Sequence, residues 1–168
     1  MKILIRILIL LITIFPFISF ALSTDKQQPA YIEADAASLN HKTGVCIYRG
    51  NVKLTQGSTT IIADTLTTYL DGQNQLQQAT AIGQLATYTT LPDNTKLPFT
   101  AVAQTINYYP IKSSVELIGE AKATQGSDSF AGPKINYDIK QQIVITPPSQ
   151  GGRTTIIIQP QQKMSLPN

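Results

Sequence analysis

The sequence has few of the side chains that most enzymes use for chemistry. Its 168 residues include one histidine, one cysteine and no tryptophan, and 14% of them are charged. A zinc site takes three or four nitrogen, sulfur or carboxylate ligands, which His41, Cys46 and scattered acids do not readily supply. A single thiol cannot form an internal disulfide. We interpret His41 as a solvated turn residue and Cys46 as a small buried hydrophobic residue.

Motifs for nucleotide binding and for nucleophilic catalysis are also missing. The sequence contains no phosphate-binding loop, no dinucleotide fingerprint and no Gly-x-Ser-x-Gly. Asp35 and Asp64 are expected to bond to backbone amides of turns or bulges. A carbohydrate-active enzyme would need two acids converging in one cleft, and the sequence indicates no such pair. We therefore predict a protein without catalytic residues, cofactor or metal.

The net charge of +3 depends on the first residues. Residues 1–21 are typical of a cleavable signal peptide, with Lys2 and Arg6 ahead of an apolar run, a break at Pro16 and the small-x-small ending Ser19-Phe20-Ala21. A retained membrane anchor is the alternative, since the run is nearly long enough to span a bilayer. Removing Lys2 and Arg6 lowers the basic count from 13 to 11 against 10 acids, a net charge of +1. Nucleic acid is therefore not an expected partner.

Helix signals are nearly absent after the signal peptide, and strand signals are plentiful. Apolar and polar residues alternate over Val45–Thr55 and again over Val115–Ala123, the pattern of a sheet with one wet face. Turn-forming residues cluster at 40–44, 70–74 and 92–96. We predict one all-β domain over residues 22–158, whose last strand begins at Arg153 and reaches Gln159, and a disordered polar tail over 159–168.

One segment of the sequence occurs twice, 69 residues apart. Gly50–Ser58 returns as Gly119–Ser127, with Gly, Lys, Thr-Gln-Gly and Ser in the same places. Glycine signals begin at 50, 83, 119 and 152, and a small-x-x-aliphatic signal begins at 36, 63, 103 and 132. We interpret them as four units of about 34 residues in a repetitive β architecture, which offers a long surface or groove.

The aromatic residues are mostly tyrosines, seven of them against five phenylalanines. A sheet interior lined by Tyr, Ala, Thr and Ile packs more loosely than one filled with Leu and Phe. Tyrosine also combines apolar area with a polar tip. Such an interior could leave a slot for acyl chains, in which each buried methylene contributes about 0.8 kcal/mol.

Three short motifs, in order, resemble the OstA-like family, and within it the LptA type. They are Gln28–Asp35, Gly50-Asn51-Val52 with Thr55-Gln56-Gly57, and Ile62-Ala63-Asp64. The resemblance runs from about residue 28 to residue 158. The sequence departs from the family pattern at Pro133, which replaces an acid, at Pro110, which interrupts a strand, and in its short tail.

The resemblance implies an open β-jellyroll of repeated antiparallel strands and a non-enzymatic role in the periplasm. Such a protein shields the lipid A acyl chains of lipopolysaccharide and stacks head to tail into a bridge between the two membranes. Its partners would be an LptC-like inner-membrane protein and an LptD-like outer-membrane protein. The strand edges expected to pair are Tyr31, Ile32 and Glu33 at one end and Thr155, Ile156, Ile157 and Ile158 at the other.

Nine residues are candidates for contact with lipid. The family motifs or the strand parity select Ala30, Ile32, Tyr48, Val52, Leu54, Tyr88, Ile106, Tyr108 and Leu117. Plain core packing is the alternative for each of them.

Two other roles remain open for the same fold. The chain could be a membrane-anchored LptC-like component, in which case the first residues would not be cleaved. It could also be a structural β-solenoid, such as an adhesin or scaffold, whose interior is too tightly packed for acyl chains.

Overall fold

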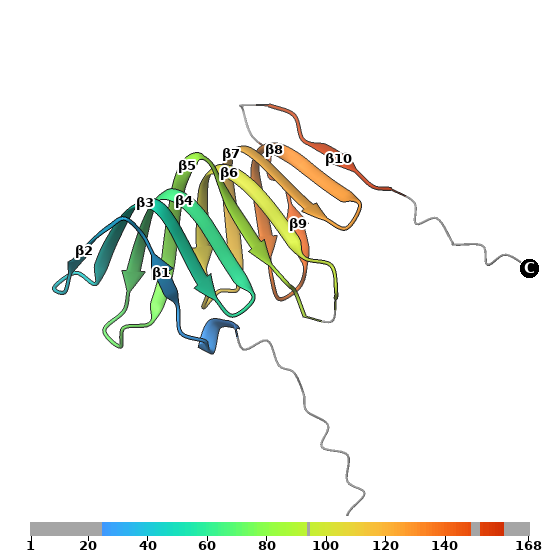
Figure 1. The fold of residues 1–168 in the computed structure, drawn as a ribbon. Helices are drawn as coiled ribbons and strands as arrows, with labels where there is room; N and C mark the ends of the chain where they lie inside the picture. Colours follow the sequence, from blue (N-terminus) through green and yellow to red (C-terminus); the bar gives the residue numbers. More distant parts are fainter. Residues whose placement is uncertain (1–24, 94, 149–151, 160–168) are drawn as a thin grey trace, which may run out of the picture.

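The computed structural model describes residues 25–93, 95–148 and 152–159 (Figure 1). The predicted signal peptide, 1–21, and residues 160–168 of the predicted tail lie outside this part of the chain. The described part is almost entirely β-structure, as predicted. Its elements are the 3₁₀ turn η1 (Asp25–Gln27) and the strands β1 (Tyr31–Glu33), β2 (Ala36–Asn40), β3 (Val45–Gln56), β4 (Thr59–Leu70), β5 (Leu76–Thr90), β6 (Phe99–Tyr109), β7 (Ser114–Gln125), β8 (Asp128–Asp138), β9 (Ile143–Ile145) and β10 (Thr155–Ile157).

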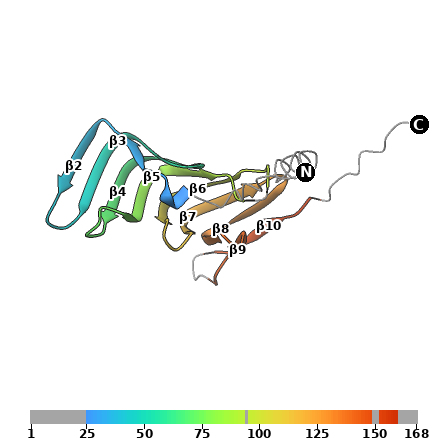
Figure 2. The same cartoon turned by 90° about the horizontal axis from the view of Figure 1, so that it is seen from below.

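The strands form one open antiparallel sheet in chain order. The long strands β3 to β8 are joined by successive hairpins, so the connectivity is a meander. Both edges are built from two short strands: β1 and β2 pair with β3, and β9 and β10 pair with β8. Figures 1 and 2 show the strands side by side from β2 at one end to β10 at the other. The sheet therefore keeps two free edges, at opposite ends of the molecule.

A line of bulges crosses the long strands near their middle. The register shifts between Arg49 and Val52 in β3, and again between Ile118 and Ala121 in β7. Gly50 and Gly119 lie at these points with φ of 77° and 78°. A Cβ on Gly50 would overlap the Asp35 carboxylate. Both the left-handed backbone and this close contact therefore favour glycine.

The two interleaved sequence signals meet along this line of bulges. The glycines face side chains as follows: Gly50 faces Asp35, Gly83 faces Asp64, Gly119 faces Gln104 and Gly152 faces Pro133. The second signal therefore begins at Ala34 in its first copy, two residues before the position taken from sequence spacing. The carboxylate of Asp64 accepts the backbone N–H of Gln84 (3.3 Å), as predicted. That of Asp35 instead accepts the side-chain amide of Asn51 (2.9 Å).

The sheet is folded at this line, so that its two halves face each other as layers. Inward residues alternate with outward ones along β3 and β7, so the predicted parity of Val45–Thr55 and Val115–Ala123 is confirmed. Phe99, before the bulge in β6, stacks on Tyr137, beyond the bulge in β8, with ring centroids 3.8 Å apart. The ring centroid of Tyr88 lies 6.0 Å from that of Tyr108 across the same interior. These rings join the layers into one core.

The 69-residue repeat of the sequence is also a repeat of the pairing register. Tyr31 pairs with Thr55, and Thr100 pairs with Thr124, 69 residues further along both strands. The same offset relates the pairs of β3 with β4 to those of β7 with β8. Together β1 and β2 therefore correspond to the single strand β6, and the structure contains two copies of one unit.

Two details of the strand prediction are wrong. Pro110 does not interrupt a strand, because β6 ends at Tyr109 and Pro110 begins the following turn. The last strand is Thr155–Ile157, shorter than the predicted run from Arg153 to Gln159. In β9, Ile143 and Ile145 face outward and Val144 packs against the core.

Candidate functional site

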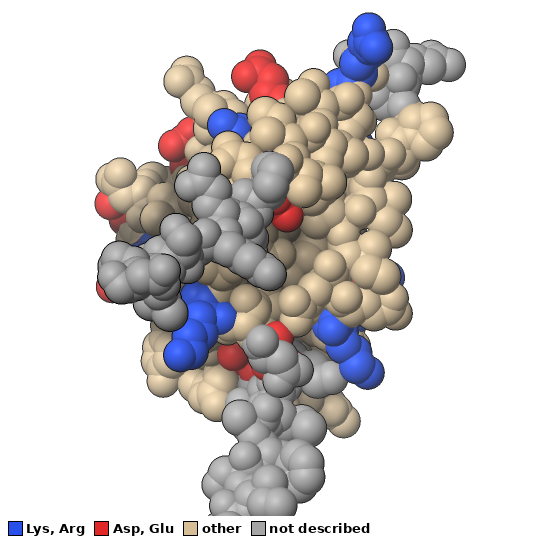
Figure 3. Space-filling view, turned by 90° about the vertical axis from the view of Figure 1, so that its right-hand side faces the viewer, with Lys and Arg blue, Asp and Glu red and all other residues tan. Residues whose placement is uncertain are grey.

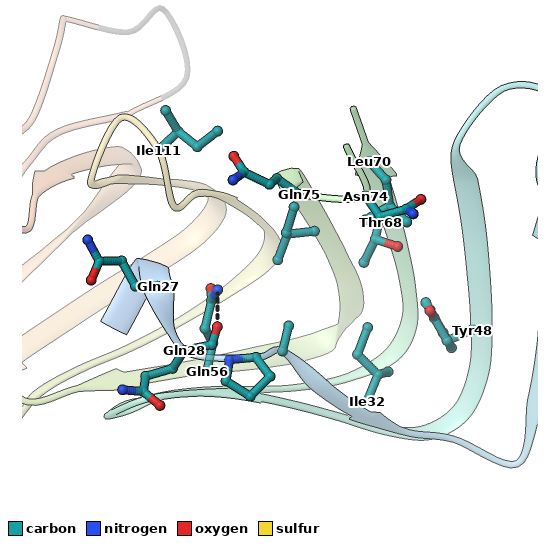
Figure 4. Close-up of a pocket in the computed structure, with 13 residues that line it drawn as sticks. Gln27, Gln28, Ile32, Tyr48, Gln56, Thr68, Leu70, Asn74, Gln75 and Ile111 are labelled. Atoms are coloured by element: carbon teal, nitrogen blue, oxygen red, sulfur yellow. Dashed lines mark hydrogen bonds between the residues drawn. The ribbon is translucent and has the colours of Figure 1, made fainter. Parts of the chain in front are cut away.

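A cavity of about 760 Å³ lies between the two layers near the end formed by β1 and β2. Figure 4 shows side chains from both layers around it. Its lining residues are Gln27, Gln28, Pro29, Ala30, Ile32, Tyr48, Gln56, Thr68, Leu70, Asn74, Gln75, Leu76 and Ile111. None of these described lining residues is charged. Aliphatic and tyrosine side chains make up its apolar walls, and neutral amides lie around it.

The cavity exists because two positions differ between the copies of the repeated unit. In the second copy Phe99 and Tyr137 stack and fill the space between the layers. The positions 69 residues earlier are Ala30 and Thr68, and both line the cavity. The first copy therefore lacks the aromatic pair that closes the second. The sequence contains this difference, but only the repeated pairing register relates Ala30 and Thr68 to the stacked pair Phe99 and Tyr137.

A buried amide marks the inner boundary of the cavity. Gln56 is 4% exposed. Its Oε1 accepts the hydroxyl of Tyr108 (3.2 Å), and its Nε2 donates to the carbonyl of Gln28 (3.1 Å). The side chain thus links both layers to the segment before β1. Thr68 lines the cavity, and its Oγ1 is buried with no hydrogen-bond partner among the described residues.

Burial disfavours the ionised form of the tyrosines in this interior. It raises the pKa of Tyr108 to about 12 and raises the pKa of Tyr48 above its ordinary value. The pKa of Tyr88 is also raised, mainly by burial. The interior therefore presents hydroxyl and amide groups without charge, an environment suited to acyl chains and their amide or hydroxyl groups.

The nine residues predicted to contact lipid fall into two groups. Ala30, Ile32 and Tyr48 line the cavity. The other six, each at most 2% exposed, lie in the closed core: Val52, Leu54, Tyr88, Ile106, Tyr108 and Leu117. Contact between these six and a ligand would require the layers to separate. Lipid contact stays a prediction for all nine.

Sequence reasoning missed several lining residues. Gln56 was visible as part of the repeated Thr-Gln-Gly, but a glutamine in a strand gave no reason to expect burial. Thr68, Leu70 and Leu76 lie on the inward face of β4 and β5, yet a threonine-rich strand carries a weak alternation signal.

The predicted strand edges lie at the two ends of the sheet. Tyr31, Ile32 and Glu33 form β1, and Thr155, Ile156 and Ile157 form β10, with Ile158 just after it. Tyr31, Ile156, Ile157 and Ile158 are 67%, 51%, 50% and 72% exposed. Figure 3, which views the β10 end, shows mostly uncharged surface with scattered Lys, Arg, Asp and Glu. These edges are apolar for exposed strands and carry few charges that would oppose pairing.

Metal and membrane-spanning features are not found in the described part of the chain. Within residues 25–93, 95–148 and 152–159, no three His, Cys, Asp or Glu side chains gather where they could hold a metal ion. The same residues include no helix of the length and apolarity needed to cross a membrane.

The sequence matches one family model and several characterised proteins. Residues 31–143 match the model of the LptA/(LptD N-terminal domain) LPS transport protein. The lipopolysaccharide export system protein LptH of Pseudomonas aeruginosa is 36% identical over 152 residues, covering 86% of this chain and 87% of that protein. LptA of Escherichia coli K12 is 33% identical over 145 residues, covering 86% of this chain and 78% of LptA.

A solved structure agrees with these matches. The crystal structure of LptH, the LptA-homologous periplasmic component of the lipopolysaccharide transport device of Pseudomonas aeruginosa, superposes with a TM-score of 0.76. The superposition covers 82% of this chain and 99% of that one, at 36% identity.

Proposed function

Because the chain belongs to the family of LptA/(LptD N-terminal domain) lipopolysaccharide transport proteins, we propose that it carries lipopolysaccharide across the periplasm, with lipid A acyl chains in the interlayer cavity. Members of this family are transport proteins, and the expectation of a non-enzymatic protein agrees with that. The observation that carries the proposal is the cavity of about 760 Å³ between the layers, whose described lining residues are all uncharged. Apolar walls would shield acyl chains, and the amides around them could bond to the polar groups where those chains join the sugars.

Photo-crosslinking from inside the cavity tests the carrier function. A photoreactive residue in place of Tyr48, which lines the cavity, should label lipopolysaccharide in the periplasm. The matched control is Thr67, on the outward face of the neighbouring strand β4. Equal labelling from both positions, or none from Tyr48, would contradict the proposed cavity.

We further propose that copies of the chain stack head to tail through their free edges. The second copy of the repeated unit supports this proposal, because β6, the equivalent of the β1 edge, pairs there with β5. Inward apolar residues are uncovered at both ends, including Leu39 (49% exposed) and Ile156. Pairing would bury them and satisfy the free backbone groups of the edge strands.

The repeat also supplies the register of this contact. Tyr88 pairs with Ile61 and with Ala101. Ile156 pairs with Phe130, which lies 69 positions after Ile61, so Ile156 takes the place that Tyr88 has in the first copy. Ile32 lies 69 positions before Ala101. Ile156 of one copy should therefore lie opposite Ile32 of the next, and Thr155 opposite Glu33. No side chain needs to change the face to which it points.

Disulfide cross-linking tests this register. Thr155→Cys with Glu33→Cys, in a Cys46→Ala background, should give a ladder of oxidised oligomers. The two sites lie on opposite edges of the monomer (Figure 1), so the disulfide must join separate copies. Thr155→Cys with Tyr31→Cys, two residues out of register, is the control. Equal ladders from both pairs would refute the register.

The bridge function also requires partners at both membranes. We expect an LptC-like protein at the β1 edge and an LptD-like protein at the β10 edge, since the matched family model includes the N-terminal domain of LptD. The runner-up role is a membrane-anchored LptC-like component. Sequencing the mature N-terminus separates the two, because a free end near Leu22 is incompatible with an anchor.

A further inference from the structure

The segment Asp25–Ala30, here called the strap, forms one wall of the cavity. Four of its residues, Gln27 to Ala30, belong to the cavity lining, and Figure 4 shows the strap running beside the cavity into β1. Its residues from Gln27 to Ala30 are also exposed. The strap therefore lies where the cavity meets the solvent.

Two sets of hydrogen bonds hold the strap against the sheet. At its start, Oδ2 of Asp25 accepts both the backbone N–H (3.0 Å) and the hydroxyl of Ser58. Gly57 lies so close that a Cβ there would overlap the Asp25 carboxylate. Further along, the carbonyl of Gln28 accepts Nε2 of Gln56. Both partners lie at the end of β3 or in the turn that follows it.

The second copy of the repeated unit shows what distinguishes the strap. Of the residues 69 positions later, Thr95 to Pro98 belong to the connection between β5 and β6, where Pro98 corresponds to Pro29. There Leu97 approaches Gly126, the equivalent of Gly57. That connection is held by a long strand on each side. Among the described residues, the strap is continuous with one strand, the three-residue β1.

We propose that the strap is a hinged gate, which swings from β1 when Asp25 and Gln28 release Ser58 and Gln56, and so admits acyl chains to the cavity. The proposal rests on the proposed carrier function. Releasing these bonds exposes polar groups that water can satisfy, so the open state costs few buried contacts. The gate should act on the rates of entry and exit more than on affinity, since it closes over free and loaded cavities alike.

A reversible lock tests the gate. Asp25→Cys with Ser58→Cys in a Cys46→Ala background places two thiols where the carboxylate and hydroxyl already touch. Binding of fluorescein-labelled lipopolysaccharide is followed by stopped flow in the oxidised and reduced forms. The oxidised protein should load and release at least tenfold more slowly than the reduced one. Protein loaded first and then oxidised should retain the probe on dilution.

A second variant weakens the latch without a disulfide. Ser58→Ala removes a hydrogen bond to a charged acceptor, and should raise the association and dissociation rates together by about tenfold. Ser127→Ala, at the equivalent turn of the second copy, is the matched control and should leave both rates unchanged.

The outcomes separate the gate from the carrier function. Oxidised and reduced forms that exchange the probe at the same rate would overturn the gate and leave the cavity as the binding site. A parent protein that binds no probe would overturn the carrier function, and the gate with it. A slow oxidised form with a fast reduced form supports both.

Discussion

Filling the cavity with the aromatic pair of the second copy should abolish acyl-chain binding without weakening the fold. The double variant Ala30→Phe with Thr68→Tyr places at these positions the residues that occur 69 positions later. Those residues, Phe99 and Tyr137, already stack with centroids 3.8 Å apart between the same two layers. The substitution therefore copies a packing arrangement that this sheet already supports.

The magnitudes follow from burial. A ring that displaces about four methylene groups of an acyl chain removes about 3 kcal/mol at about 0.8 kcal/mol each, or about two-hundredfold in Kd. The same rings gain buried area and a stacking contact of about 0.5–1.5 kcal/mol, so the free energy of unfolding should stay constant or rise. The Thr68→Tyr substitution also removes a buried hydroxyl that has no hydrogen-bond partner among the described residues, and its ring fills the space.

Two measurements check this prediction. Titration with fluorescein-labelled lipopolysaccharide gives Kd, and urea unfolding followed by circular dichroism gives the stability. Ala30→Ser with Thr68→Ser, which adds no ring, is the control and should bind like the parent. A double variant of unchanged stability and unchanged Kd would refute the assignment of the acyl chains to this cavity.

Three further predictions concern the fold. Burial raises the pKa of Tyr108 to about 12, so its contribution to stability is complete below the unfolded pKa of about 10 and is lost as the pH rises toward 12. By pH 11 the free energy of unfolding should have fallen by about 1.4 kcal/mol from this group. In urea unfolding, the stability of Tyr108→Phe should fall less steeply with alkaline pH than that of the parent. Gly119→Ala should lower the free energy of unfolding by about 1–3 kcal/mol, because φ is 78° and the new Cβ meets Gln104. An unchanged midpoint of urea unfolding would contradict the role given to the bulge line. Lys134→Met breaks an ion pair with Glu116 on the solvent-facing side of the sheet and should lower the free energy of unfolding by less than about 1 kcal/mol. A larger loss would show that this pair stabilises the fold more than its exposure implies.

The sequence by itself determined the strands and their faces. Alternation over Val45–Thr55 and Val115–Ala123 predicted which residues point inward, because a pleated strand has a period of two whatever its neighbours. The turn clusters predicted the ends of the strands within a few residues. The family followed from short motifs in a fixed order, and the family match and the relatives confirm it.

Local pattern misplaced features that depend on which strand lies opposite. The small-x-x-aliphatic signal was assigned to Ala36, but the register places its first member at Ala34. Ile143 and Ile145 share a parity, yet it is the outward one, since pairing with β8 and not apolarity sets the face.

Only the tertiary structure decided what happens between the layers. Gln56 and Tyr108 are 52 residues apart, and no local pattern links them. The cavity depends on Ala30, just before β1, and Thr68, in β4, which no local pattern links and which the fold brings to one cavity. The strap matters for the same reason, since Asp25 meets Ser58 only after β1 has paired with β3. Sequence sets the direction of each side chain, but the bend along the bulge line sets what that side chain meets.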